Sequence, residues 1–533
     1  MTTVVWNLGQ RGAHRMLGVV RALAIGLCGI GLAGCWSIPD VQQMQEMRAE
    51  SAVERLGALK ERQPLDDRGV YLSGALTLGE ALEKGLRLNL TLQQETLERE
   101  IAAGKIQASM ENVLPNLSAS GGYTRLDDDL SSTDENGVRT QGRFVDQYDA
   151  GLRVTQPLFN GHIMAAVRAA RLYREWAEAS IRNVEDTVHY NVVEAYYNAV
   201  LSGHLLEVQV AALDTAERQL SEENARRRQG MASNYDVLRA TVEVSNFKAQ
   251  VLQAQNDKDR AYTLLFRLIG ASPESEVTLT DALPLVNETI HFGSALQTAL
   301  SRRADLAVAE YAVRMQREAV RNAAGNYFPE ISLFAAQNWG NPDPHDSSSD
   351  DWGDEWSAGV QFSWSIFDGL GRKGTLRQER ATLQQQELAL QDAEENVVSV
   401  IRQLVLSLKT AAEFAESQSK NLETAKEALR LVEVGLREGQ NTQVEVMDAR
   451  QALTTASANY YQSIFDHAMV RLQLQKAMGL FADGALPDVP VLGGSDISMP
   501  IEDEDAQAET DVMQAAEKVE SLPALADDES PAE

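Results

Sequence analysis

The sequence contains a long internal repeat, which limits the architectures that the chain can form. Gly439 follows Gly230 by 209 residues, and Glu445 follows Asp236 by the same interval. A pattern that occurs in both copies is hard to attribute to chance, and the interval is far longer than the unit of a solenoid. Each copy is therefore expected to form one half of a single architecture.

The composition favours helices and excludes nucleic-acid binding. The chain of 533 residues has a formal net charge of -30, and phosphates would be repelled by such a surface. Proline is scarce, with 14 residues, and strong helix formers are common. Residues 480–533 are rich in Asp and Glu and poor in aromatic residues, so this acidic tail is expected to be disordered.

Residues 1–34 have the organisation of a lipoprotein signal peptide. Arginines precede a short apolar run that ends in Leu-Ala-Gly-Cys, which resembles a bacterial lipobox. The resemblance implies that Cys35 becomes the lipidated first residue of the mature protein; the alternative is an ordinary export signal with an incidental cysteine. The next residue, Trp36, is not the Asp that favours retention at the inner membrane, so the outer membrane is favoured. Translation could start at Met1 or Met16.

Two segments alternate between apolar and polar residues with the period of β-strands. The predicted hairpins are residues 117–159 and 331–367, and each strand places apolar side chains on one face and small or polar ones on the other. Strands of about ten residues with this pattern are typical of a transmembrane barrel. Soluble hairpins with one buried face are the alternative. Outside the signal, no run of about 18 apolar residues occurs, so a membrane crossing would have to be made of β-structure.

Helical periodicity follows each hairpin. Long helices are predicted over residues 162–229 and 370–436, and return helices over 232–269 and 442–478. At 1.5 Å per residue the long helices would measure about 100 Å and the return helices about 57 Å. A shorter helix precedes each hairpin, over 91–113 in the first copy. Stacked on the return helix, it would match the length of the long helix, so each copy should build two parallel rods.

These elements divide the chain into two repeats, residues 77–270 and 296–479, joined by a linker at 271–295 and preceded by an extension at 35–76. One chain would supply only four strands, whereas closed membrane barrels have at least about eight. Because strand edges cannot remain exposed to lipid, the chain is expected to oligomerise. Two, three or four copies would close a barrel, and with three the helical rods would enclose a lumen of about 25 Å.

Together these features resemble the TolC family of outer-membrane channels over residues 77–479. The resemblance is carried by Pro115 and Pro329 before the hairpins, the Phe-Asn-Gly and Phe-Asp-Gly turns ending at Gly161 and Gly369, and the segment 438–449, which reads Glu-Gly-Gln-Asn-Thr-Gln-Val-Glu-Val-Met-Asp-Ala. Ser365 departs from the proline usual in the second turn, whereas Pro157 keeps it in the first.

The resemblance implies a mainly α-helical protein with a membrane β-domain. In that family, three copies form a twelve-stranded transmembrane β-barrel and a long coiled-coil α-helical barrel through the periplasm. The family acts as the passive exit duct of tripartite systems, driven by an inner-membrane pump or ABC exporter through a periplasmic adaptor protein. The lipobox is similar to that of the lipidated branch of the family, but residues 36–76 lack the usual opening of that branch.

The turns between the long and return helices are candidate contact sites for the adaptor. Arg228 and Gly230 lie in the first turn, and Arg437 and Gly439 in the second. The alternative is structural. Glycine after a helix end allows the turn that satisfies the terminal carbonyls, and arginine in the last turn interacts favourably with the helix dipole. The adaptor role is implied by the family alone.

Three carboxylates just beyond these turns are candidates for the periplasmic aperture. Glu445 and Asp448 lie three residues apart on one helix face, and Asp236 occupies the position of Glu445 in the first repeat. In the resembling family, acidic residues here surround the closed mouth, where they would favour cations. Stabilisation of a helix start by negative charge is the alternative. Arg239 stands where the second repeat has Asp448.

The sequence indicates no enzyme, cofactor or metal site, since the seven histidines are scattered without ligand spacing. Three functions remain open: an efflux channel, a type I protein-secretion channel of the same fold, and a lipid-anchored coiled-coil tether without a pore. Ion conductance would separate the channels from the tether. The sequence does not identify the cargo, because a wide passive duct has no need to recognise it.

Overall fold

The computed structural model describes most of the two repeats. The described residues are 69–126, 131–133, 139–141, 145–283, 285, 290–345 and 351–481. They belong to one unit of the chain, Asp67–Glu533. The predicted signal peptide, Cys35, most of the extension and nearly all of the acidic tail lie outside the described residues.

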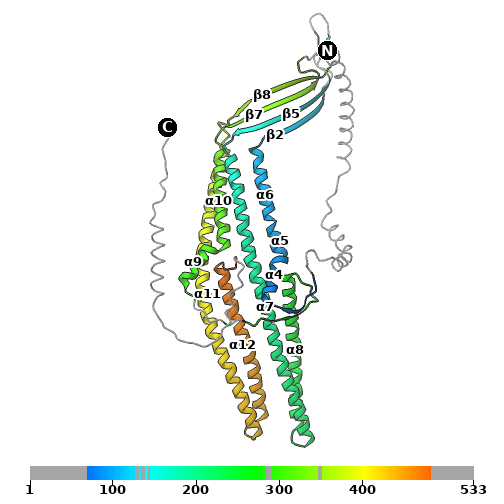
Figure 1. The fold of residues 1–533 in the computed structure, drawn as a ribbon, viewed down its shortest axis with the longest axis vertical. Helices are drawn as coiled ribbons and strands as arrows, with labels where there is room; N and C mark the ends of the chain where they lie inside the picture. Colours follow the sequence, from blue (N-terminus) through cyan, green and yellow to red (C-terminus); the bar gives the residue numbers. More distant parts are fainter. Residues whose placement is uncertain are drawn as a thin grey trace. The chain divides into compact units, whose positions relative to one another are not determined.

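Four long helices form two antiparallel hairpins (Figure 1). In the first repeat, α7 (Ile163–Arg228) packs against α8 (Asn234–Ile269); in the second, α11 (Gly371–Arg437) packs against α12 (Gln443–Ala477). Contacts between α7 and α12 join the two hairpins, so the order across the layer is α8-α7-α12-α11. The outer rods of this layer are therefore α8 and α11.

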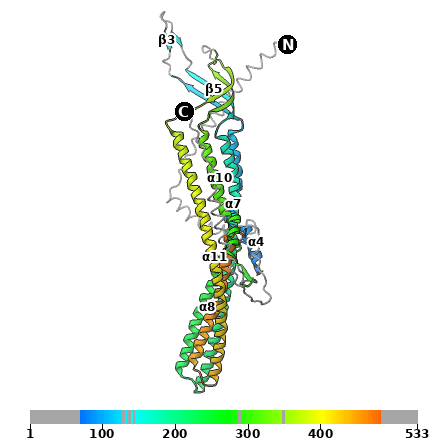
Figure 2. The same ribbon diagram turned by 90° about the vertical axis from the view of Figure 1, so that its left-hand side faces the viewer.

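Shorter helices continue the rods towards the strands. In the second repeat, α9 (Phe292–Arg302) packs on α11, and α10 (Ala304–Gly325) packs between α7 and α11. In the first repeat, α4 (Leu78–Leu88), α5 (Leu90–Thr96), α6 (Glu98–Ser109) and the short 3₁₀ helix η2 (Met110–Asn112) occupy the corresponding place along α7. Figure 2 shows α10, α7 and α11 running alongside one another below the strands.

The prediction of one continuous helix over residues 91–113 is wrong. The helix is broken at Leu97, whose amide donates to Gln94 O at 3.2 Å in a tightened turn. The hydroxyl of Thr96 donates to Gln93 O at 2.8 Å, and such a bond competes with the regular helix ladder. Its counterpart α10 runs unbroken over 22 residues.

A four-stranded antiparallel sheet joins the two repeats. Its order is β2-β5-β7-β8, with β2 at Asn116–Arg125, β5 at Asp146–Phe159, β7 at Glu330–Asn341 and β8 at Gly353–Ser363. The pairing of β5 with β7 connects the first hairpin to the second. A short antiparallel pair, β3 (Ser131–Thr133) with β4 (Arg139–Gln141), lies within the connection from β2 to β5. Within this sheet, β2 and β8 are the edge strands.

The strand register separates the sheet into an apolar and a polar face. Because residues that lie opposite each other on paired strands share a face, the apolar positions can be followed across all four strands. Leu117 pairs with Val154, Val154 with Ala335, and Ala335 with Ala358. On the other face, Ser118 pairs with Arg153 and Ser120 with Gly151. The alternation read from the sequence thus becomes a continuous property of the sheet.

A parallel strand pair, which the sequence analysis did not predict, joins the extension to the inter-repeat linker. Strand β1 (Ser73–Leu76) pairs with β6 (Glu276–Leu279), so residues 271–295 are not simply a linker. The hydroxyl of Tyr196 on α7 lies 2.9 Å from Leu76 O and 2.7 Å from Asp281 Oδ2. Asp281 also accepts the Leu78 amide at 2.7 Å, which fastens the start of α4 to the same point.

The main apolar core lies where α4 and the strand pair meet α7. Tyr196, Leu265 and Ile269 are fully buried in it. Phe481 also belongs to this core, because its ring stacks on His189 at a centroid distance of 4.3 Å. The predicted acidic tail therefore begins with residues that pack against the helices. Among the described residues, no helix combines the length and apolar character needed to cross a membrane.

Two glycines allow the junction between strands and helices to form. A Cβ on Gly325 at the end of α10 would lie 2.5 Å from the carbonyl carbon and oxygen of Gly161, just before α7. A Cβ on Gly161 would in turn lie 2.4 Å from Gly325 O. Backbone atoms cannot move aside as side chains do, so this approach requires glycine in both repeats.

Gly325→Ala is expected to destabilise the junction by about 1–3 kcal/mol, because overpacking must displace the backbone of the neighbouring repeat. Gly203→Ala is the matched control: this glycine lies inside α7 with no atom within 4 Å of an added Cβ. The control should gain about 0.5–1 kcal/mol from higher helix propensity. Thermal unfolding followed by circular dichroism measures both, and equal midpoints for the two variants would contradict the account.

Candidate functional site

Two similar turns connect the long and return helices at the ends remote from the sheet. Gly230 and Gly439 adopt left-handed conformations, with φ of 75° and 72°. After α7, Met231 N donates to Arg226 O at 2.9 Å; after α11, Gln440 N donates to Gly435 O at 2.8 Å. Glycine adopts this conformation at little cost and closes a helix end in both repeats.

The four predicted tip residues lie on these turns and are exposed. Arg228 is the last residue of α7 and Arg437 the last residue of α11. Each precedes its glycine by two residues. The first turn is more basic, because Arg226, Arg227 and Arg228 all lie in the last turn of α7, whereas α11 has Arg437 alone there.

Asp236 closes the start of α8 in a capping box. Its Oδ2 accepts the Ser233 amide at 2.8 Å and the Ser233 hydroxyl at 2.7 Å, while Asp236 N donates to Ser233 Oγ at 3.2 Å. This arrangement satisfies amides that a helix start otherwise leaves free. The bonds from the Ser233 hydroxyl and amide lower the pKa of Asp236.

Glu445 performs the same task at the start of α12. Its Oε2 accepts the Thr442 amide at 2.7 Å and the Asn441 side-chain amide at 3.1 Å. The amide of Glu445 in turn donates to Thr442 Oγ1 at 3.4 Å. The Thr442 backbone bond, followed by the bond from Asn441, lowers the pKa of Glu445. Because both carboxyl pKa values are depressed, the two caps are intact above the ordinary carboxyl pKa and are lost as the pH falls through the depressed values.

Asp448 lies one turn further along α12, and its position differs from that of the other two carboxylates. Its side chain makes no hydrogen bond or ion pair among the described residues. Its charge acts on Glu243 of α8, whose pKa is raised first by burial and further by Asp448, while Arg450 and Arg239 lower it. Glu445 and Asp236 are held within their own turns, so the structure does not join the three predicted carboxylates by hydrogen bonds.

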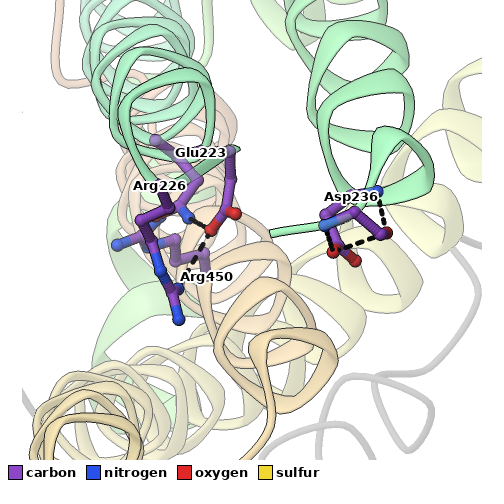
Figure 3. Close-up of polar contacts among 6 residues, drawn as sticks. Glu223, Arg226, Asp236 and Arg450 are labelled. Atoms are coloured by element: carbon purple, nitrogen blue, oxygen red, sulfur yellow. Dashed lines mark hydrogen bonds and ion pairs between the residues drawn. The ribbon is translucent and has the colours of Figure 1, made fainter. Parts of the chain in front are cut away.

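A polar network that was not predicted from the sequence ties the two hairpins together near the tips. Arg450 on α12 donates to Glu433 of α11 at 3.0 Å and to Gln219 of α7 at 3.3 Å. The Gln219 side-chain amide donates to Glu223 at 2.9 Å, and Glu223 also accepts from Arg226 at 3.3 Å. Figure 3 shows Arg450 approaching Glu223 and Arg226, with Asp236 set apart at the start of α8.

Burial makes this network costly to disrupt. Glu223 is 3% exposed and Gln219 is 8% exposed. A carboxylate in such surroundings needs its partners, because a lost partner leaves an uncompensated buried charge. The signal in the sequence was an i,i+4 pair of polar residues, Gln219 and Glu223, on the buried face of a long helix. Their partner lies 231 residues away from Gln219 at Arg450, and no local pattern identifies it.

A cavity of about 200 Å³ adjoins Arg450. Residues of all four long helices line it, including Ala216 of α7, Phe247 of α8, Leu429 of α11 and Leu453 of α12. The two hairpins therefore meet through side chains that do not fill the space between them. Polar contacts at Arg450 hold them together beside this gap.

The described residues contain no cluster of three or more His, Cys, Asp or Glu side chains that could hold a metal ion. The polar groups at the tips are those of helix caps and of the Arg450 network. Such groups can attract ions and hold helices in register.

The sequence profile described as "Outer membrane efflux protein" matches residues 81–271 and 295–480, one segment for each repeat. The chain is 22% identical over 396 residues to the outer membrane protein TolC of Vibrio cholerae, covering 74% of this chain and 88% of that protein. It is 20% identical over 413 residues to the alkaline protease secretion protein AprF of Pseudomonas aeruginosa, covering 76% of this chain and 84% of that protein.

The fold is also found among solved structures. A crystal structure of a membrane protein from Pseudomonas aeruginosa superimposes with a TM-score of 0.65 at 19% identity, covering 75% of this chain and 93% of that one. The resemblance drawn from the duplicated turns is thus confirmed, and the profile match spans most of both repeats. This chain belongs to the outer membrane efflux protein family.

Proposed function

We propose that this protein is the outer-membrane exit duct of a tripartite efflux system. In this role it is a passive channel that receives cargo from an inner-membrane pump through a periplasmic adaptor. One observation carries the proposal. The sheet has an apolar and a polar face, and both the sheet and the layer of four long helices have unpaired elements at their outer edges. The family to which the chain belongs is one of transport ducts, and the role requires no catalytic residue.

The unpaired edges support a ring of identical copies. On one side of the protomer lie β2 and α8, and on the other lie β8 and α11. Large apolar side chains are exposed along both outer rods: Tyr235, Leu238 and Val242 on α8, and Leu406, Phe414 and Leu431 on α11. Because the two edges are different, a copy joins its neighbour head to tail, and such contacts close into rings. Three copies would supply a twelve-stranded barrel.

The two faces of the sheet suit the wall of that barrel. The apolar face would contact lipid, and the polar face, with Ser118 and Arg153, would line the water-filled interior. Exposed aromatic residues near strand ends, such as Trp356 and Tyr123, suit the interfacial girdles. Lipidation of Cys35 would add an anchor in the same membrane, a proposal that rests on the lipobox alone.

The tips and the aperture form the periplasmic end of the proposed duct. Arg228 and Gly230, together with Arg437 and Gly439, are the surface offered to the adaptor. Asp236, Glu445 and Asp448 would bring carboxylates to the mouth in each of three copies. Arg450 then holds α12 against α7, so opening the mouth would require the bonds of Arg450 to Gln219 and Glu433 to break.

A protein-secretion channel is the second candidate, since AprF, a relative over most of this chain, is named for protease secretion. Both roles use the same duct and differ in the pump that feeds it. Pull-down of the inner-membrane partner would distinguish them, by recovering either an efflux pump or an ABC exporter. A tether without a pore, the remaining alternative, would give no ion conductance in planar bilayers.

Replacing Glu445 by Gln and Asp448 by Asn is expected to weaken block of the channel by multivalent cations at least several-fold, because a ring of negative charge is removed from the mouth. Single-channel recording in planar bilayers with a trivalent cation measures the effect. Glu438→Gln, an exposed carboxylate in the same turn, is the control. Equal block in the double variant and in the unmodified channel would exclude the aperture role of these residues.

Arg450→Ala is expected to raise the conductance or the open probability, because it removes the bonds of Arg450 to Gln219 and Glu433 and so frees α12 from α7. Arg430→Ala is the matched control: Arg430 is an exposed arginine of α11 that pairs with Glu427 of the same helix at 2.7 Å. Losing that surface pair should cost at most about 1 kcal/mol and leave conductance unchanged. A current through Arg450→Ala indistinguishable from the control would show that this network does not restrain the mouth.

A further inference from the structure

A second cavity, of about 470 Å³, lies where α12 ends and α10 begins. Asp186 and Tyr190 of α7 form one wall, and Val400 of α11 forms part of another. Lys476, in the last turn of α12, and Asp305, in the first turn of α10, also line the cavity. The cavity therefore occupies the joint at which the return helix of the second repeat meets the short helix stacked on it.

Asp186 is buried in this joint without a partner. Asp186 is 6% exposed, and its Oδ1 has no hydrogen-bond partner among the described residues. The ammonium group of Lys476 lines the same cavity but lies over the Tyr190 ring, 4.8 Å from its centroid. No ion pair joins Asp186 to Lys476 in the part of the chain that the structure describes. An isolated buried carboxylate is costly to keep ionised.

Two other charged residues at the joint, Arg303 and Asp305, pair with each other. Arg303 pairs with Asp305 at 2.7 Å and donates to Ala477 O at 3.2 Å, which caps the end of α12 from the start of α10. Glu185 and Arg182 of α7 act on Asp186 with opposite signs. From α11 the cavity receives the apolar side chains of Val400 and Leu404.

Burial is the largest cause that raises the pKa of Asp186, to about 6, with Glu185 adding to the effect and Lys476 opposing it. A group whose pKa is raised stabilises its packing fully below the ordinary pKa, and this stabilisation is lost as the pH rises through the raised value. For Asp186 the loss falls between about pH 4 and pH 6. Burial lowers the pKa of His189, on the same helix, to about 4, so this ring stays neutral in this packing above that value.

We propose that Asp186 makes the joint between α12 and α10 sensitive to protons, so that acid favours the present packing and neutral pH favours one in which the carboxylate meets Lys476 or water. This regulation rests on the proposed channel function, because the far end of α12 carries the mouth. The helix has 35 residues and acts as a lever about 52 Å long. A tilt of about 5° at the joint would move its far end by about 4–5 Å.

Hydrogen exchange of the full-length protein in lipid vesicles tests the proposal. Protection factors of amides in residues 470–479, corrected for intrinsic exchange, are compared at several pH values from 4.5 to about 7.5. They should fall at least several-fold as the pH rises. Asp186→Asn should remain at the protected, acid-like level throughout. Lys476→Met should move the midpoint to higher pH, because it removes the positive charge that favours the ionised carboxylate.

Asp392→Asn, an exposed carboxylate of α11, is the control and should retain the profile of the unmodified protein. A flat profile in the unmodified protein would overturn the proposal. So would a pH dependence that persists in Asp186→Asn. Conductance at a fixed pH is recorded separately: a protein that conducts without the pH response refutes only the proton-sensitive joint. A pH response without conductance refutes the channel instead.

Discussion

The structure depends on elements that one chain leaves unpaired. Strands β2 and β8 are the edges of a four-stranded sheet, and α8 and α11 are the outer rods of the helical layer beneath it. Unpaired strand edges are unfavourable in lipid, where no water can bond the backbone, and exposed apolar stripes on helices are unfavourable in water. Because each side of the protomer carries one strand edge and one outer rod, a neighbouring copy could cover both together. The duplication explains this geometry, since each repeat contributes one strand hairpin and one helix hairpin.

The ends of the rods combine two kinds of polar interaction. Asp236 and Glu445 satisfy amides at the starts of their helices, so much of their chemistry is local. Arg450 acts over a longer range by joining α12 to α11 and α7 beside a cavity of about 200 Å³. The caps act within single turns, whereas the bond from Arg450 to Gln219 joins one hairpin to the other. In the proposed channel, the mouth would open without unfolding if the bonds between the hairpins broke while the caps within each turn stayed intact.

Regular elements with strong periodicity were predictable from the sequence, and long-range pairings were not. The ends of α7 and α11 lie within one residue of those expected, because long helices with glycine at the turn carry a continuous local signal. Strand β1 has four residues and pairs with β6 about 200 residues away, so no local pattern identifies it. The break at Leu97 coincides with a side-chain bond of Thr96 to the backbone, which the helical periodicity does not reveal. At the tips, the positions of Asp236 and Glu445 at helix starts could be read from the sequence, but the role of Arg450 could not, because its partners lie on other helices.

The number of copies in the assembled protein shows whether the outer strands of neighbouring protomers pair. Native mass spectrometry of the detergent-solubilised, full-length chain gives this number as a multiple of the protomer mass. We expect three copies, in which the edges β2 and β8 of neighbouring protomers pair and the strands form one closed barrel. A stable monomer with a folded sheet would contradict it, because both edges would then remain unpaired in the membrane. A different closed number would contradict the twelve-stranded barrel.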